Sequence, residues 1–231
     1  MCRGAFTRVL KLGLLTSFVV LALSACSGGG GGQRAEQEEE VKARAVPEYG
    51  DLRPGKYVTD EFKPAFSFEV VDKGWVVGGA EERGILDMRQ GVEGGVLSFL
   101  NEQEVFDPSK PGELDNVPAP KNLITWLQRH PYLETEQPQP ATIGGVKGMQ
   151  LDAVVADDVP ASECGDNCLG LFMITREIPW VAYEKERVRF IVLEDVGGER
   201  VTIAVEALAV DFEEFLPKAQ ETIDTVEWKG A

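Results

Sequence analysis

The sequence predicts an α+β fold in which helices pack on an antiparallel β-sheet. Two neighbouring segments carry most of this prediction. Between Arg187 and Val210, apolar side chains recur at every second position on both sides of a Gly197-Gly198 turn, which is the pattern of a β-hairpin. Between Asp211 and Val226, apolar side chains recur at helical spacing. Because the chain is also 43% hydrophobic, it can bury a core, and wholesale disorder is excluded.

Short apolar or alternating runs predict further strands. Those that precede the long hairpin are Phe66–Val70, Trp75–Val77, Ile85–Met88 and Val96–Leu100. An Asp72-Lys73-Gly74 turn predicts that the first two of them form a hairpin. The segment 101–120 is rich in Asp, Pro, Asn and Gly and is expected to be a long loop. Another hairpin is expected around Gly144-Gly145, and a last short strand at 226–228.

Two helices are expected to pack on the sheet. The first begins at Pro120, where a missing N–H is tolerated, and Pro131 ends it. In the second, Asp211 and Glu214 are placed to form a capping box. Pro217 interrupts the second helix and is expected to kink or restart it.

The N-terminus has the three parts of a secretory signal. A basic segment, MCRGAFTRVLK, precedes an apolar run from Leu12 to Leu23, which is too short to span a bilayer comfortably. The run ends in Leu-Ser-Ala-Cys, which resembles the lipobox of bacterial lipoproteins. That resemblance implies cleavage between Ala25 and Cys26 and transfer of a diacylglyceryl group to the Cys26 thiol. The alternative is an ordinary cleaved signal that happens to be followed by a cysteine.

These features divide the chain into three parts. Residues 1–25 are predicted to be a lipoprotein signal peptide, 26–50 a flexible Gly/Glu-rich tether, and 51–231 a single α+β domain. The formal net charge of −16 argues against nucleic acid as a partner, because phosphates require a basic surface. The lipid on Cys26 would hold the protein on the outer side of the cell membrane, as its only membrane contact.

A Phe-x-Phe-x-Val strand, a turn and a Gly-Trp pair open the domain, at Phe66, Val70 and Trp75. With a mid-chain helix, long hairpins and a terminal helix, this order resembles the Mog1/PsbP-type α/β/α sandwich. That group includes many secreted bacterial lipoproteins, among them the LpqN-like ones. The resemblance implies a binding or assembly module, and it supplies no catalytic residues.

Cys164 and Cys168 are the most informative pair inside the domain. Outside the cytoplasm, two cysteines this close normally oxidise to a disulfide, and three intervening residues allow the geometry if they form a turn. A thioredoxin-type redox pair has two intervening residues, and zinc would need ligands beyond the single histidine. A structural disulfide is therefore predicted.

No catalytic, metal or cofactor site is predicted from the remaining residues. The acidic segment 157–166 lacks the alternating order that holds calcium, although a loosely held cation stays conceivable. His130 has no identifiable catalytic partner and is expected to interact with a helix end. Gly144-Gly145-Val146-Lys147-Gly148 lacks the spacing of a phosphate loop.

Trp180 and Tyr183 are candidates for a ligand groove, although a tryptophan in a strand is more often packed on its sheet. The expected function is that of a non-enzymatic binding or assembly module of the cell envelope. Its partner would be an envelope protein or a small ligand. The alternative is a carboxylate-dependent hydrolase of wall or extracellular material, since acid pairs cannot be identified by sequence alone.

Overall fold

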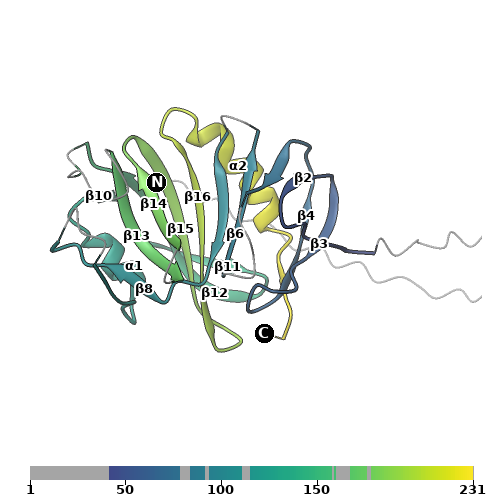
Figure 1. The fold of residues 1–231 in the computed structure, drawn as a ribbon, viewed down its shortest axis with the longest axis horizontal. Helices are drawn as coiled ribbons and strands as arrows, with labels where there is room; N and C mark the ends of the chain where they lie inside the picture. Colours follow the sequence, from purple (N-terminus) through teal and green to yellow (C-terminus); the bar gives the residue numbers. More distant parts are fainter. Residues whose placement is uncertain are drawn as a thin grey trace, which may run out of the picture. The chain divides into compact units, whose positions relative to one another are not determined.

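Three β-sheets and two helices make up the described part of the chain in the computed structural model (Figure 1). It describes residues 42–78, 84–91, 94–110, 115–157, 159, 167–175 and 178–230. All of these elements belong to one compact unit, Glu40–Ala231. The fold is mostly antiparallel β-sheet, so the α+β prediction holds only in its coarser form.

The largest sheet has nine strands, and all of its pairings are antiparallel. Eight follow one another across the sheet: β10 (Leu133–Thr135), β12 (Val146–Val155), β15 (Glu186–Val196), β16 (Glu199–Leu208), β7 (Val96–Leu100), β6 (Ile85–Gln90), β5 (Trp75–Val77) and β2 (Gly50–Leu52). The ninth strand, β11 (Gln139–Ile143), pairs with the first half of β12. Both predicted glycine turns are confirmed, because Gly144-Gly145 and Gly197-Gly198 all have positive φ and join paired strands.

Two smaller sheets of four strands each complete the β-structure. The first contains β1 (Arg44–Ala45), β3 (Gly55–Val58), β4 (Phe66–Val70) and β17 (Glu227–Trp228), and its β1–β3 pairing is parallel. The second contains β14 (Ile178–Tyr183), β13 (Cys168–Thr175), β8 (Glu104–Phe106) and β9 (Asn116–Pro118).

The longer helix, α2 (Phe212–Ile223), buries one face through Phe212, Phe215, Ala219 and Ile223. The predicted capping box is absent, because the side chain of Asp211 makes no capping hydrogen bond and only its carbonyl accepts from the first turn. The helix is continuous past Pro217, so the predicted restart is wrong. Burial of the apolar face outweighs the backbone hydrogen bond that proline removes.

The shorter helix, α1 (Leu123–Gln128), begins after Asn122 and not at Pro120 as predicted. The side-chain oxygen of Asn122 accepts a hydrogen bond from the backbone N–H of Thr125 at 2.9 Å, which is the N-cap interaction. Leu123, Ile124 and Leu127 are buried beneath the helix.

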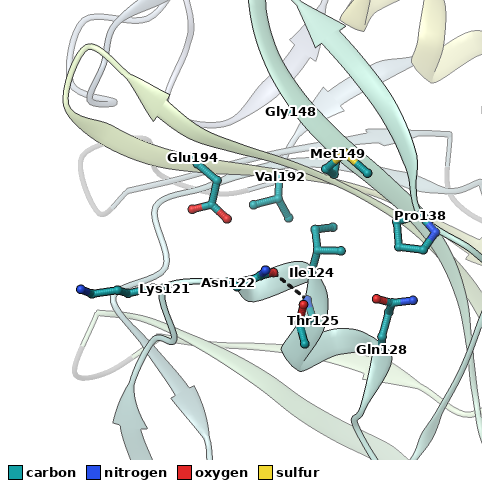
Figure 2. Close-up of a pocket in the computed structure, with 10 residues that line it drawn as sticks. All are labelled: Lys121, Asn122, Ile124, Thr125, Gln128, Pro138, Gly148, Met149, Val192 and Glu194. Atoms are coloured by element: carbon teal, nitrogen blue, oxygen red, sulfur yellow. Dashed lines mark hydrogen bonds between the residues drawn. The ribbon is translucent and has the colours of Figure 1, made fainter.

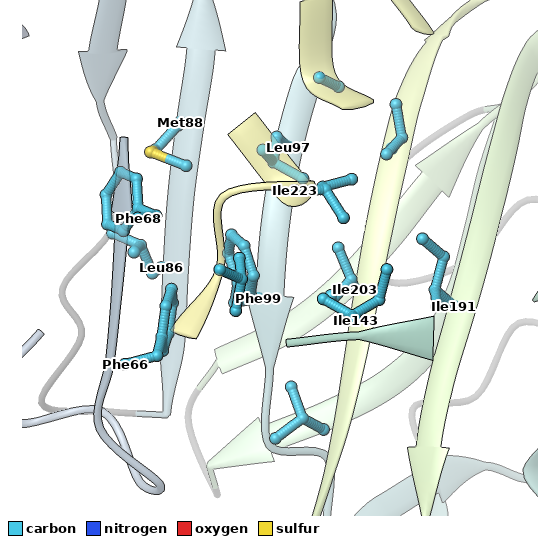
Figure 3. Packing of buried hydrophobic residues seen from close by; sticks show 14 of the residues in the cluster. Phe66, Phe68, Leu86, Met88, Leu97, Phe99, Ile143, Ile191, Ile203 and Ile223 are labelled. Atoms are coloured by element: carbon cyan, nitrogen blue, oxygen red, sulfur yellow. The ribbon is translucent and has the colours of Figure 1, made fainter. Parts of the chain in front are cut away.

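The central sheet is apolar on both faces, and each face has its own core. One core lies between the central sheet, α2 and the sheet of β1, β3, β4 and β17 (Figure 3). In it Phe66 packs on Phe99 with ring centroids 4.6 Å apart, and Ile223 of α2 lies near Leu97. The other core lies between the opposite face, α1 and the sheet of β8, β9, β13 and β14. Each outer layer thus combines one helix with a four-stranded sheet, whereas the expected α/β/α sandwich would have outer layers made of helices.

Three further expectations require correction. The strands at 66–70 and 75–77 do not form a hairpin, because β4 pairs with β3 and β17 whereas β5 pairs with β2 and β6. The expected loop 101–120 contains β8 and β9, which pair with each other. Regular structure begins before residue 51, since β1 and the first residue of β2 lie within the segment expected to be a tether.

No helix among the described residues is long and apolar enough to cross a membrane.

Replacing Phe215 by Ala should reduce the free energy of unfolding by about 3 to 5 kcal/mol. Phe215 is 4% exposed, and its ring packs beside Trp75 with a centroid distance of 5.9 Å. Equilibrium urea unfolding measures the change. Val210→Ala is the control, since Val210 is 87% exposed and should change stability by less than about 0.5 kcal/mol. Equal effects of the two substitutions would show that the apolar face of α2 is not buried.

Candidate functional site

The residues predicted to be lipidated or disulfide-bonded lie mostly outside the described part. Ala25, Cys26 and Cys164 are not among the described residues. Cys168 is the first residue of β13 and is buried. Lipidation of Cys26 and the pairing of Cys164 with Cys168 therefore stay predictions.

The predicted groove at Trp180 and Tyr183 is not formed by these two side chains. Trp180 is 5% exposed and lies in the core between Phe172 and Phe190, with ring centroids 5.5 and 5.8 Å away. Tyr183 is half exposed. Successive side chains of a strand point to opposite faces, so two residues three positions apart on β14 cannot line the same surface.

His130 is a buried structural residue. Its ring packs edge-on against Trp126, with a centroid distance of 5.1 Å, and its Nδ1 accepts a hydrogen bond from the backbone N–H of Tyr132 at 3.3 Å. Burial lowers the pKa of His130 to about 4, so the imidazole is neutral at physiological pH. It therefore carries no charge to interact with the end of α1, which corrects the sequence-based expectation.

No group of three or more His, Cys, Asp or Glu side chains within the described ranges could hold a metal ion. Of the four acidic residues singled out in the segment 157–166, only Asp157 is described; Asp158, Glu163 and Asp166 fall outside the described residues. The five residues from Gly144 form the β11–β12 turn and the start of β12, as the sequence indicated.

A groove of about 560 Å³ separates α1 from the central sheet (Figure 2). Ten residues line it: Lys121, Asn122, Ile124, Thr125, Gln128, Pro138, Gly148, Met149, Val192 and Glu194. Its walls are α1 with the residues just before it, and the strands β12 and β15 together with Pro138.

The apolar part of the groove is built on aligned strand positions. Met149 of β12 lies directly opposite Val192 of β15, so their side chains are neighbours on one face of the sheet. Ile124 of α1 points toward these two side chains from the other wall (Figure 2). Met149 is 37% exposed, which leaves a large apolar side chain open to the groove.

Gly148 lies in the groove lining at a position where a side chain would clash with β15. A Cβ atom there would lie 2.3 Å from the carbonyl oxygen of Val192 and 2.7 Å from Cδ2 of Leu193. A glycine is therefore needed at this position of β12. The sequence suggested only a turn around this glycine.

The polar groups of the groove lie at its rim. Asn122 is committed to capping α1, as the dashed line in Figure 2 shows. Lys121 extends away from the other lining side chains, whereas Glu194 points from β15 toward α1 (Figure 2). Glu194 is the only acidic residue among the ten that line the groove.

Glu194 belongs to a row of three charged residues. Nε of Arg200 lies 3.2 Å from Oε2 of Glu194, and Nη1 of Arg200 lies 3.5 Å from Oε1 of Glu102. The exposed fractions of the side chains are 48% for Glu194, 20% for Arg200 and 0% for Glu102. The row thus leads from the groove wall into the interior.

Burial raises the pKa of Glu102 to about 7. Three groups partly oppose this rise: the backbone of Glu102 itself, the charge of Arg200 and the hydroxyl of Thr202. The carboxylate of Glu194 adds to the rise. Glu102 lies two residues after β7, in the segment that the sequence suggested was a loop. Its position after an apolar strand was the only available signal of burial.

A second group of carboxylates lies toward the other end of the same face of the central sheet. Burial raises the pKa of Asp87. The pKa of Glu206 lies well above its usual range, because Glu206 is buried and because the carboxylates of Glu186 and Asp87 are close to it. Arg89 is the cation that opposes both shifts. None of these residues lines the groove.

Two smaller hollows lie elsewhere on the described surface. One of about 390 Å³ is formed by Trp126, His130 and the prolines at 108 and 120, next to α1. Another, of about 520 Å³, lies beside Phe215 between α2 and the β6–β7 connection. We take the groove between α1 and the sheet as the candidate site, because it is the larger and combines an apolar wall with a charged row.

No protein-family model matches the chain, and no match is found among curated proteins. Among solved structures, the chain is similar to LpqN of Mycobacterium tuberculosis, whose crystal structure is described as that of a protein involved in cell envelope biogenesis. The similarity covers 78% of this chain and 89% of that chain, at 10% sequence identity and a TM-score of 0.29. A TM-score this low supports no conclusion about fold or function.

Replacing Glu102 by Gln should change how stability depends on pH. Because the folded state holds the proton of Glu102 more tightly than the unfolded state does, the stability that this group contributes is fully present below about pH 4.5 and is lost as the pH rises to about 7. The loss amounts to at most about 3 kcal/mol. Between these pH values the wild type should therefore lose stability relative to Glu102→Gln, as urea unfolding at several pH values would measure.

Glu199→Gln is the matched control, since Glu199 is exposed on the neighbouring turn. Its stability should follow that of the wild type across the pH range. Parallel curves for wild type and Glu102→Gln would show that Glu102 ionises as easily in the folded protein as in the unfolded chain.

Proposed function

We propose that this protein is an extracytoplasmic lipoprotein, anchored to the cell membrane through Cys26, whose domain is a non-enzymatic binding module of the cell envelope. Its ligand, a small molecule or part of an envelope protein, places an apolar body in the groove between α1 and the strands β12 and β15. The observation that carries the proposal is the groove itself, with Met149, Val192 and Ile124 facing one another and a polar rim around them.

The dimensions and chemistry of the groove support binding of a small ligand. A volume of about 560 Å³ is within the range of small-molecule sites, which are mostly apolar with a few polar groups that orient the ligand. The apolar side chains come from strands and a helix, so their positions are held by the sheet and by the cap of α1.

The same lining argues for binding over catalysis. A carboxylate-dependent hydrolase of the usual kind uses a pair of acids, and Glu194 is the only acid among the ten described residues that line the groove. No nucleophilic serine or cysteine and no histidine is present in this lining. Among its described lining residues, the groove therefore offers contact surface and a single carboxylate, since Lys121 extends away from the apolar side chains.

A carboxylate-dependent hydrolase is the alternative, and the acids at the other end of the sheet are its best candidates. Asp87 and Glu206 have raised pKa values, as an acid catalyst requires. Hydrolysis of wall polymer by the purified protein, lost in Glu206→Gln with the fold intact, would favour the hydrolase over the binding module.

A tryptophan at Met149 should abolish binding of an apolar probe. The larger side chain would fill the space between β12 and α1. The measurement is the fluorescence of the neutral dye N-phenyl-1-naphthylamine, titrated with the chain from Ser27 onward, which retains the whole unit Glu40–Ala231. We expect saturable enhancement with the wild type and a loss of at least tenfold in affinity with Met149→Trp.

Val71→Trp is the control for the added aromatic ring, because Val71 is exposed and lines none of the three hollows described above. It should bind the dye like the wild type. Equal affinity of Met149→Trp and the wild type would place the dye outside the groove and contradict the proposal.

Replacing Cys26 by Ala should release the protein from membranes. Two acyl chains give stable anchoring, and an acidic body does not adhere to anionic lipid by itself. The measurement is the distribution of the protein between membrane and soluble fractions of its own cells, with the Cys2→Ala variant as control. Retention of Cys26→Ala on the membrane at the level of the wild type would show that lipid on Cys26 is not the anchor.

A further inference from the structure

The charged row at the end of the groove contains two carboxylates and one guanidinium. Arg200 lies between Glu102 and Glu194, at 3.5 and 3.2 Å respectively. The strand pairings explain this order, because Leu100 of β7 lies opposite Thr202 of β16, which in turn lies opposite Val192 of β15. Each charged residue lies two positions from one of these paired residues: Glu194 on β15, Arg200 on β16, and Glu102 just beyond the end of β7.

Arg200 is the only cation that acts on Glu102 within the described part of the chain. The other groups that face Glu102 are the hydroxyl of Thr202 on β16 and the carboxylate of Glu194 on β15. The backbone of Arg200 is held by Asn101, whose side-chain amide donates a hydrogen bond to the Arg200 carbonyl oxygen at 3.2 Å.

The free-energy cost of losing the ion pair with Arg200 differs greatly between the two carboxylates. A charged Glu102, fully buried, has no water to replace the guanidinium, so losing its partner would be strongly unfavourable. Glu194 is about half exposed, so water can solvate it, and an ion pair of this kind contributes little. A charged Glu102 therefore draws Arg200 inward, and Glu194 is left free at the wall of the groove.

A free carboxylate beside an apolar surface fits a ligand with a cationic group on an apolar body. The acidic protein, with a net charge of −16, also attracts cations and repels anions. Lys121, the one basic residue that lines the groove, extends away from the apolar side chains (Figure 2).

We propose that Glu194 recognises a cationic group on an apolar ligand, and that the protonation state of Glu102 controls this recognition through competition for Arg200. The inference rests on the proposed binding function of the groove. It adds the chemical class of the ligand and a response to pH. With Glu102 protonated, Arg200 pairs with Glu194 and the groove favours neutral apolar ligands. With Glu102 ionised, Glu194 is released and the groove gains affinity for an ammonium group.

Two small probes with the same apolar chain, one with a neutral and one with a cationic head group, test this proposal. Hexanol and hexylammonium have the same apolar chain, and an alkylammonium stays protonated at both about pH 5.5 and about pH 8.5. Binding is followed by the ¹³C-methyl signal of Met149 in the methionine-labelled chain from Ser27 onward. Met88 and Met173 are buried and are not among the residues that line the groove, so their signals report whether the fold is intact.

In the wild type, the affinity for hexylammonium relative to hexanol should rise about threefold from the lower to the higher pH, the size expected for a partly exposed ion pair. In Glu102→Gln the ratio should stay at its low-pH value at both pH values, because the amide never ionises. In Glu194→Gln the ratio should be low throughout, because the recognising carboxylate is absent.

The outcomes separate this inference from the function on which it depends. If hexanol shifts the Met149 signal but the pH response of Glu102→Gln equals that of the wild type, the groove binds and the control by Glu102 is wrong. If the ratio in Glu194→Gln still rises with pH, Glu194 is not the recognising group. If neither probe shifts the Met149 signal, the groove is not a binding site, and both proposals fail.

Discussion

The structure depends on a central sheet that is apolar on both faces. Side chains such as Phe99 and Ile203 point to one face, and Phe190 and Val192 of β15 point to the other. A sheet of this kind must be covered twice, because apolar surface left in water is unfavourable on either side. Each face is covered by one helix and one four-stranded sheet, and the two outer layers are formed by different parts of the chain.

The groove is a consequence of incomplete cover on the second face. The helix α1 has only six residues, and it reaches the sheet over Leu123, Ile124 and Leu127. Beside it, Met149 stays 37% exposed next to the buried Val192, and the charged row begins two residues further along β15, at Glu194. An apolar wall and a buried ion pair therefore meet at one place, which is the physical basis of the proposed binding site and of its response to pH.

Local signals predicted the local parts of this structure. The hairpins at Gly144-Gly145 and Gly197-Gly198 were predictable because glycine pairs, which adopt positive φ easily, and alternating apolar residues are visible in the sequence itself. The partners of β4 and β5 were not, because the turn between them indicates a hairpin, whereas β4 pairs with strands from both ends of the domain. Pairing with β17 joins residues about 160 positions apart, and no short pattern carries that information.

The same limit applies to the site. Trp180 was a candidate for a groove, although packing on the sheet was the more frequent alternative, and the structure shows the latter, because side chains of β13 and β15 enclose it. Met149 and Val192 are ordinary strand residues by sequence, and they line a site only because a groove lies between them and α1. The most direct measurement is a crystal structure with N-phenyl-1-naphthylamine bound. We expect the dye to lie between Ile124, Met149 and Val192. A dye bound beside Phe215, with the groove empty, would contradict the assignment of the groove as the binding site.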